Sequence, residues 1–367
     1  MIKQSAIKKI LVVLPNWIGD AVMSAPAISQ IKEGFPSARI TVIGLPHISE
    51  LFYESPYVDE IQVYKNNPSI SPFTKGGDRG IDVLVSSGLS LRPEKFDMAL
   101  LLPNSFRSAL LVRLAGIPLR CGYNRDGRGF LLTMPIRLTP QLKRVHQVEY
   151  YLHLARSILT FNPPISPFNK GGLRGIGGMG ALLFLSKDEI RQAKETLGKY
   201  QITAEDLLIG INPGATYGSS KRWYPERFSQ VAAALVQKYH AKIILFGGPG
   251  ERGIAEEIIR ASAPSLLNMA GQTTIRGLMA LLSQCRLLIT NDSGPMHIAA
   301  ALGVPVAAIF GSTDPTITAP AGSRHVVIKK DVLCSPCFRR KCPTNLECMD
   351  LIRVEDVLGG VEKILGQ

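Results

Sequence analysis

The feature that most constrains the fold is the order of apolar runs and amphipathic segments at the start of the chain. Residues 8–14 carry a run of aliphatic and β-branched side chains, which is typical of a strand buried on both faces. A helical pattern follows over about 20–32 and stops near Gly34, and residues 39–44 form the next apolar run. This order predicts a βαβ unit, and therefore a parallel sheet with right-handed crossovers.

The same alternation continues along the chain. The first half has a further predicted strand at 97–102 and a helix at 105–115. The second half has predicted strands at 207–211, 242–246, 286–290 and 304–309, and predicted helices at about 225–239, 251–262, 274–284 and 294–302. Because 367 residues are enough for two α/β domains, we expect two Rossmann-like halves. We place them at 1–185 and 186–350, followed by a C-terminal amphipathic helix in 351–367.

Two near-identical Gly/Pro-rich segments interrupt the pattern, at residues 71–81 and 166–176. Two copies are too few for a solenoid, which needs at least three stacked repeats. We interpret them as low-complexity insertions near 70–81 and 165–178, with little structure of their own and no catalytic role. A pair of ligand-binding loops is the alternative.

The charge balance predicts an acidic partner. The formal net charge is +13, and the stretch from Arg92 to Arg144 holds ten Lys or Arg against three acidic residues. This stretch is either a solvated basic face or a docking surface for anionic lipid. Nucleic acid is a weaker candidate, because only 7% of residues are aromatic and no recognised binding motif occurs. Without a signal peptide or an apolar run of 18 residues, we expect a protein that is soluble or at most peripheral to a membrane.

The loop after the first strand brings a carboxylate to an edge where α/β sheets bind ligands. Asp20 follows Gly19 at the start of the predicted helix. It is either a helix N-cap or a general base that accepts a proton from an incoming hydroxyl. The loop is not GxGxxG, and the chain has no GxxxxGK[ST] motif. Dinucleotide oxidoreduction and ATP hydrolysis are therefore disfavoured.

Two loops of the second half suit an anionic ligand. Residues 212–225 combine small and hydroxyl side chains with Lys221 and Arg222 after a buried strand, which favours a phosphate cradle over an ordinary polar loop. Residues 290–301 place an Asp-Ser-Gly turn at a helix start, which suits a diphosphate. His297 falls in the first turn of that helix, where it is either a ligand contact or an ordinary packed histidine.

Two further segments of the second half contain candidate site residues. Glu251 follows a glycine-rich turn, where it either accepts hydrogen bonds from a ribose or belongs to a plain turn before a capped helix. Residues 311–315 follow the next strand and are expected to line the same pocket as the Asp-Ser-Gly turn.

Four of the six cysteines are close in sequence, and Cys121 and Cys285 lie alone in apolar surroundings, as inert core residues do. The close group is Cys334, Cys337, Cys342 and Cys348. Such a group either holds structural zinc, stays reduced or forms an adventitious disulfide. The spacing matches no strong zinc pattern, so reduced thiols or a disulfide are favoured over metal.

Several segments in this order and spacing resemble the ADP-heptose:lipopolysaccharide heptosyltransferase family. The resemblance covers nearly the whole chain apart from the two insertions, and is carried by residues 14–23, 102–109, 122–129, 146–151, 213–223, 291–297 and 334–338. Within the family, residues 103–107 and 146–151 favour the type II transferases, heptosyltransferase II, with types I and III as alternatives.

The resemblance implies a GT-B fold, with two Rossmann-like domains facing across a cleft, and an inverting transfer without metal or other cofactor. Asp20 would be the general base, and Lys221 would stabilise the departing diphosphate. The nucleotide-sugar contacts implied are Thr216, Lys221, Glu251, Asp292, Ser293, Gly294 and His297. The acceptor contacts expected are Asn16, Arg107, Arg125 and Arg128.

The implied partners are ADP-heptose, the heptosyl-Kdo-lipid A acceptor and the cytoplasmic face of the inner membrane, with no nucleic acid. A sugar-nucleotide epimerase is the rival from another class, since it shares the two-domain architecture but needs no lipid acceptor. An assay with the nucleotide sugar alone separates the two.

Overall fold

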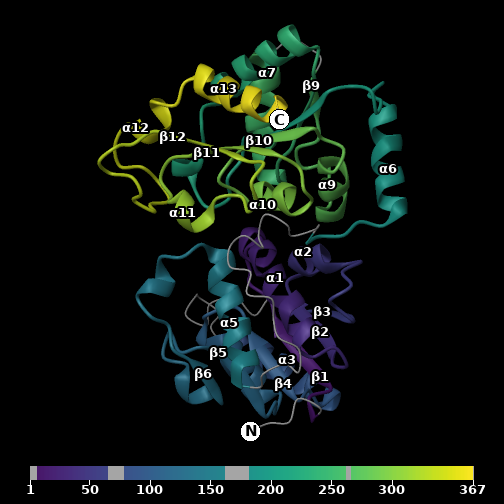
Figure 1. The fold of residues 1–367 in the computed structure, drawn as a ribbon, viewed down its shortest axis with the longest axis vertical. Helices are drawn as coiled ribbons and strands as arrows, with labels where there is room; N and C mark the ends of the chain where they lie inside the picture. The colour runs from purple at the N-terminus through teal and green to yellow at the C-terminus, as the bar shows by residue number, and fades with distance from the viewer. Residues whose placement is uncertain (1–5, 65–77, 162–181, 262–265, 367) are drawn as a thin grey trace. The chain divides into compact units, whose positions relative to one another are not determined.

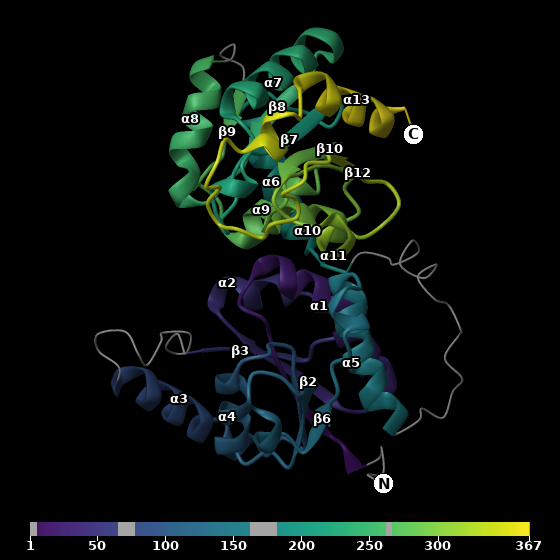
Figure 2. The ribbon, with the colours of Figure 1, turned by 90° about the vertical axis from the view of Figure 1, so that its left-hand side faces the viewer.

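The computed structural model describes residues 6–64, 78–161, 182–261 and 266–366. The chain divides into two compact units, residues 1–170 and 171–367. Each unit is built on one parallel six-stranded sheet (Figures 1 and 2).

The first unit has the strand order β3-β2-β1-β4-β5-β6. Its strands are β1 (Lys9–Val13), β2 (Arg39–Gly44), β3 (Glu60–Val63), β4 (Met98–Leu101), β5 (Leu119–Tyr123) and β6 (Met134–Ile136). Its helices are α1 (Ile18–Gly34), α2 (Pro46–Ser49), α3 (Asp78–Ser90), α4 (Phe106–Leu114) and α5 (Gln147–Phe161). Strand β1 pairs with β2 and β4, and burial on both faces explains its continuous apolar run. Helix α1 packs against α5 on one face of the sheet, and α3 packs against α4 on the other (Figure 2).

The second unit repeats this topology, with the order β12-β11-β10-β7-β8-β9. Its strands are β7 (Leu208–Asn212), β8 (Lys242–Leu245), β9 (Leu266–Asn268), β10 (Leu287–Asn291), β11 (Val306–Phe310) and β12 (Val326–Lys329). Its helices are α6 (Lys187–Gly198), α7 (Pro225–Tyr239), α8 (Arg252–Ala261), α9 (Ile275–Leu282), α10 (Gly294–Ala301), α11 (Pro315–Thr318), α12 (Glu347–Asp350) and α13 (Val354–Leu365).

The C-terminal helix is part of the core of the second unit. Helix α13 packs on β11, β12 and α7 (Figure 1). The indole of Trp223, in the loop before α7, is buried, and its Nε1–H donates a hydrogen bond to the carbonyl of Ile352 at 3.0 Å. This bond connects the loop after β7 to the segment that leads into α13.

The predicted elements lie within about two residues of the observed ones, and the α/β fold class is confirmed. The interpretation of residues 70–81 as a loop is wrong for residues 78–81, which begin helix α3. The rest of the first repeat and the whole of the second lie outside the described residues.

Among the described residues, no helix combines the length and the apolar character that a bilayer-spanning segment requires.

Candidate functional site

Three neighbouring strands of the second unit end beside one another. Strand β10 pairs with β7 on one side and β11 on the other, all in parallel, so their carboxyl ends lie at one edge of the sheet. Ligands of parallel α/β sheets bind at this edge. The loops that follow these strands contain most of the predicted nucleotide-sugar contacts.

The centre of this edge is an ion pair. Lys221 Nζ lies 2.6 Å from Asp292 Oδ2, and the two side chains are only 14% and 5% exposed. Thr313, after β11, donates its hydroxyl to the same carboxylate oxygen at 2.6 Å. A shielded pair of this kind is costly to form unless its geometry is good and its other lone pairs are satisfied, and here the threonine satisfies one of them. The contact fixes the lysine beside the start of helix α10.

Two asparagines at the strand ends hold the loops together. Asn291 is fully buried, accepts a hydrogen bond from the Trp223 N–H at 3.1 Å and donates one to Pro213 O at 2.7 Å. Asn212 donates to Ser293 Oγ at 3.2 Å. Neither asparagine has a role predicted from the sequence. The signal that could have revealed them is a polar residue closing an otherwise apolar, buried strand.

Ser293 precedes helix α10 as its N-cap, but its side chain makes no capping bond. Its hydroxyl lies 3.1 Å from Thr290 Oγ1 instead. The first amides of a helix have no partner within the helix, so those that begin at Gly294 favour an anion. In addition, Asn212 Oδ1 is buried and, within the described part of the chain, accepts no hydrogen bond. His297 is buried in the same helix.

Glu251 lies beside the same loops. Its carboxylate accepts the Gly248 N–H at 2.8 Å and covers Gly214, where a Cβ would overlap it. Glu251 is therefore held by the turn before α8 and at the same time adjoins the loop after β7. Thr216 lies in an exposed turn of that loop. The structure thus joins Lys221, Asp292 and the Ser293–Gly294 turn directly, with Glu251 beside them and Thr216 at the rim.

In the first unit, Asp20 is in the first turn of helix α1. The N-cap of this helix is Trp17, so the alternative in which Asp20 is the N-cap is wrong. Asp20 is half-buried. Burial of the Tyr151 ring in α5, and after it the negative charge of Asp20, raises the pKa of that tyrosine. The carboxylate is near the carboxyl end of β1, as a general base at this edge requires.

Asn16 and Arg107 line one pocket of about 220 Å³, at the carboxyl ends of β1 and β4. Ser105 and Tyr64 also line it. Burial lowers the pKa of the Arg107 guanidinium. The pocket brings together two of the predicted acceptor contacts.

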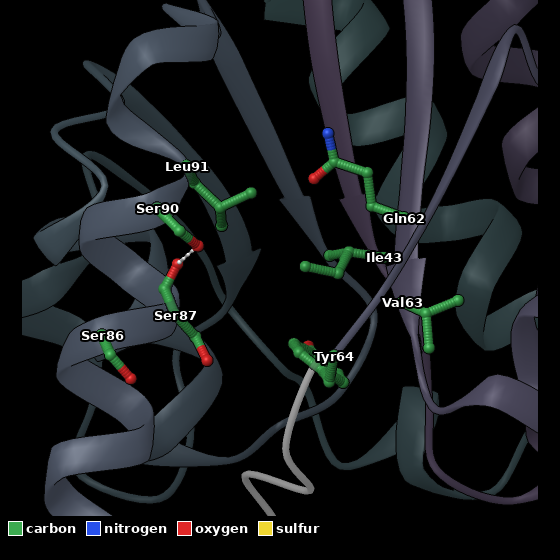
Figure 3. Close-up of a pocket in the computed structure, with 8 residues that line it drawn as sticks. All are labelled: Ile43, Gln62, Val63, Tyr64, Ser86, Ser87, Ser90 and Leu91. Carbon is green, nitrogen blue, oxygen red and sulfur yellow. Dashed lines mark hydrogen bonds between the residues drawn. The ribbon is translucent and has the colours of Figure 1, made fainter.

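A second pocket, of about 460 Å³, shares Tyr64 with the first. In Figure 3, Ser86, Ser87 and Ser90 of α3 line one side and Gln62 of β3 the other, with Ile43 between them. Its lining contains hydroxyl, amide and aliphatic groups but no ionised side chain. This composition suits a neutral, hydroxyl-rich ligand better than a phosphate.

Arg125 and Arg128 are placed very differently. Arg125 is exposed and pairs with Asp126 at 3.3 Å. Arg128 is 0% exposed. Its guanidinium donates to Pro103 O, to Tyr123 O at 3.0 Å and to the Ser108 hydroxyl at 3.1 Å. In the structure the Arg128 side chain therefore holds the loop after β4, which leads to Arg107. Its role as an acceptor contact stays a prediction.

The basic stretch from Arg92 to Arg144 is likewise not a uniform surface. Arg92 donates to Leu114 O at 2.8 Å and Arg120 donates to Leu131 O at 2.6 Å. With Arg128, three of its guanidinium groups therefore bind backbone carbonyls. Fewer cations are available to a docking surface than the sequence count indicates.

All six cysteines lie among the described residues and carry free thiols. Burial raises the pKa of Cys121 to about 12 and raises that of Cys285 as well, as expected of core residues. Within the described residues, no three His, Cys, Asp or Glu side chains are placed to hold a metal ion.

Comparison with known proteins gives concordant results. Residues 85–347 match the model of glycosyltransferase family 9 (heptosyltransferase). Lipooligosaccharide heptosyltransferase 2 of Haemophilus ducreyi is 33% identical, and lipopolysaccharide heptosyltransferase 2 of Escherichia coli K12 is 30% identical, each match covering 88% of both chains. The solved structure of E. coli ADP-heptose lps heptosyltransferase II superposes with a TM-score of 0.78 at 28% identity, covering 98% of this chain and 99% of the other.

Proposed function

Since the chain belongs to glycosyltransferase family 9, the heptosyltransferases, we propose that it moves L-glycero-D-manno-heptose from ADP-heptose onto the inner-core heptose of lipopolysaccharide. The observation that carries the proposal is the Lys221–Asp292 ion pair at the start of helix α10. The relatives named above, all of type 2, support the choice of acceptor.

The donor half of the reaction needs a site for a leaving diphosphate. When the bond from the anomeric carbon to the diphosphate oxygen breaks, the electron pair leaves with ADP and negative charge develops on its phosphates. Lys221 and the first amides of α10 form a fixed set of donors for that charge, and Thr313 and Asp292 hold the lysine in place. Preorganised donors of this kind are worth on the order of a hundredfold or more in rate each. In this proposal the transfer needs no metal ion.

Four further residues are placed where they could contact the nucleotide sugar. Glu251 adjoins the loop after β7 and presents a carboxylate that suits ribose hydroxyls. Ser293 and His297 flank the helix start, and Thr216 lies at the exposed rim of the same loop.

The acceptor half needs a base and a pocket. Asp20 takes the proton of the acceptor hydroxyl as that oxygen forms a bond to the anomeric carbon from the face opposite the diphosphate, which inverts the configuration. Asn16 and Arg107 bind the acceptor in the pocket they share, with the guanidinium facing an acidic sugar or phosphate. The exposed Arg125 adds a weaker, salt-sensitive attraction.

Because the acceptor is a lipid, we propose that the protein acts at the cytoplasmic face of the inner membrane and binds it peripherally. The net charge of +13 supports attraction to an anionic surface.

One assay tests the reaction and the acceptor together. Purified protein is incubated with ADP-heptose and truncated acceptors ending in Kdo, in one heptose or in two, and acceptor mass and ADP release are followed. We expect a gain of one heptose on the one-heptose acceptor, with an equal amount of ADP. Gain on the Kdo acceptor would assign type I, and gain on the two-heptose acceptor would assign type III. Conversion of ADP-heptose without any acceptor would instead indicate an epimerase.

A further inference from the structure

The cysteine-rich segment, residues 334–348, is bonded directly to the turn that carries Lys221. Tyr217 donates its hydroxyl to Phe338 O at 2.6 Å. Ser220 donates its N–H to Arg340 O at 3.2 Å and its hydroxyl to Arg339 O. Two stretches about 120 residues apart in sequence are therefore joined by three hydrogen bonds.

The fit between them leaves no room for a side chain. A Cβ at Gly218 would overlap the backbone carbonyl of Arg340. Ser220 is buried beneath this contact. Because backbone atoms cannot yield as the end of a long side chain can, the close approach requires glycine at this position.

The same segment is bonded to the end of β11. Phe338 donates its N–H to Ser312 O at 2.8 Å, and Ser335 donates its hydroxyl to Gly311 O at 2.6 Å. The next residue, Thr313, holds Asp292. The segment is thus connected to both partners of the ion pair at the donor site.

This arrangement gathers two cations on one aromatic ring. Lys221 Nζ lies 4.9 Å from the centre of the Tyr217 ring, and the guanidinium carbon of Arg340 lies 5.4 Å from it. Lys221 is paired with Asp292, whereas Arg340, within the described part of the chain, has no carboxylate within ion-pair distance. The π-system of the ring attracts each cation, but the two cations repel each other. An anion bound beside the ring would remove that repulsion.

We propose that Arg340 is a second cation of the donor site and that its ligand class is the diphosphate group of a nucleoside diphosphate. The inference rests on the proposed function. Asp292 already neutralises Lys221, so a diphosphate that contacts the lysine still carries uncompensated charge, and the guanidinium of Arg340 can donate two parallel hydrogen bonds to its oxygens. The cysteine-rich segment positions this arginine through its backbone.

Calorimetric binding of ADP, AMP and inorganic pyrophosphate to the full-length protein tests the proposal. In R340Q we expect affinity for ADP and pyrophosphate to fall by about tenfold, the effect of one charge-assisted contact, and affinity for AMP to fall less. R340K should recover part of the loss. The matched control is R339Q. Arg339 is exposed like Arg340, but among the described residues only the Arg340 guanidinium of these two lies over the Tyr217 ring, so we expect R339Q to alter each affinity by less than about twofold.

Three outcomes would overturn the inference: unchanged binding in R340Q, an equal loss in R339Q, or an equal loss for AMP and pyrophosphate. A thermal melt of each variant reports whether its fold is kept. If the unaltered protein binds ADP but transfers no heptose, the proposed function fails and this inference stands.

Discussion

The two units share one strand order but use a buried cation in opposite ways. In the first unit, Arg128 is enclosed and, among the residues that the structure describes, has no carboxylate within ion-pair distance; it binds carbonyls and a hydroxyl around the loop after β4. In the second, Lys221 is paired with Asp292 at the carboxyl end of β10. Burial lowers the pKa of Arg128 to about 10, which leaves the guanidinium protonated at neutral pH.

The different partners of the two buried cations indicate what the carboxyl-end edge of each sheet can do. A guanidinium that donates to several groups of the protein gives a loop a fixed shape. An ammonium paired with one carboxylate can also bind an incoming anion, because the anion only has to take part in an ion pair that already exists. We therefore expect changes in the second unit to affect the handling of the nucleotide, and changes at Arg128 to affect folding.

The largest effect is expected at Asp20. D20N removes the proposed base, and general-base catalysis contributes about a hundredfold to ten-thousandfold. The rate of transfer should fall by that amount while ADP affinity is unchanged, as measured by ADP release and calorimetry. D188N, a change at an exposed acid in the first turn of α6, is the matched control. Transfer at the normal rate in D20N would remove this residue as the base.

The next effect is expected at Lys221. K221M removes the cation of the ion pair, and we expect the rate of transfer to fall by about a hundredfold to a thousandfold, with weaker ADP binding. The comparable surface change K238M removes a lysine paired with Glu362 and should leave both quantities nearly unaltered. If ADP binding and transfer survive in K221M, the donor site lies elsewhere.

Because Arg128 holds a loop and Lys221 an anion site, we expect a change at Arg128 to lower the stability of the fold. R128M leaves several buried acceptors without a donor, so the free energy of unfolding should fall by about 3 kcal/mol in urea titrations. R125M removes an exposed pair and should change it by less than about 0.5 kcal/mol. Reduced use of the acceptor by R128M at unchanged stability would show instead that Arg128 contacts the acceptor.

The smallest effect is expected at Arg107. R107Q removes one charge from the pocket it shares with Asn16, and the KM for the acceptor should rise by about five- to tenfold with ADP affinity unchanged. R113Q, at the other end of the same helix and exposed, is its control. An equal loss of ADP binding in R107Q would place this arginine at the donor site.

Much of the fold could be predicted because the central strands are buried on both faces, which gives the continuous apolar runs at β1, β7 and β10. Strand β3 is only partly buried and β6 has three residues, so neither gives such a run. The pairing of Lys221 with Asp292 was not predicted as a contact, although both residues were. That required the register of β7 and β10, which depends on the whole sheet.

The direction of a side chain was harder to predict than its place in a loop. Arg125 and Arg128 lie three residues apart in one motif, yet one is exposed and the other is enclosed. Sequence spacing carries no information about that choice, which is made by Gly122 and the loop after β4 packing around the guanidinium. That Asp20 of the first unit and Lys221 of the second act on the same donor and acceptor stays a prediction.

The bond from Trp223 to Ile352 has a consequence for biosynthesis. Every strand of the second sheet leaves the ribosome before Ile352 does, so a nascent chain ending near residue 345 contains β7 to β12 but lacks the carbonyl that holds the indole. Domains fold in the order in which they are translated. The first unit can therefore complete its core early, whereas the loop that carries Lys221 gains this anchor only after all six strands of its sheet have been synthesised.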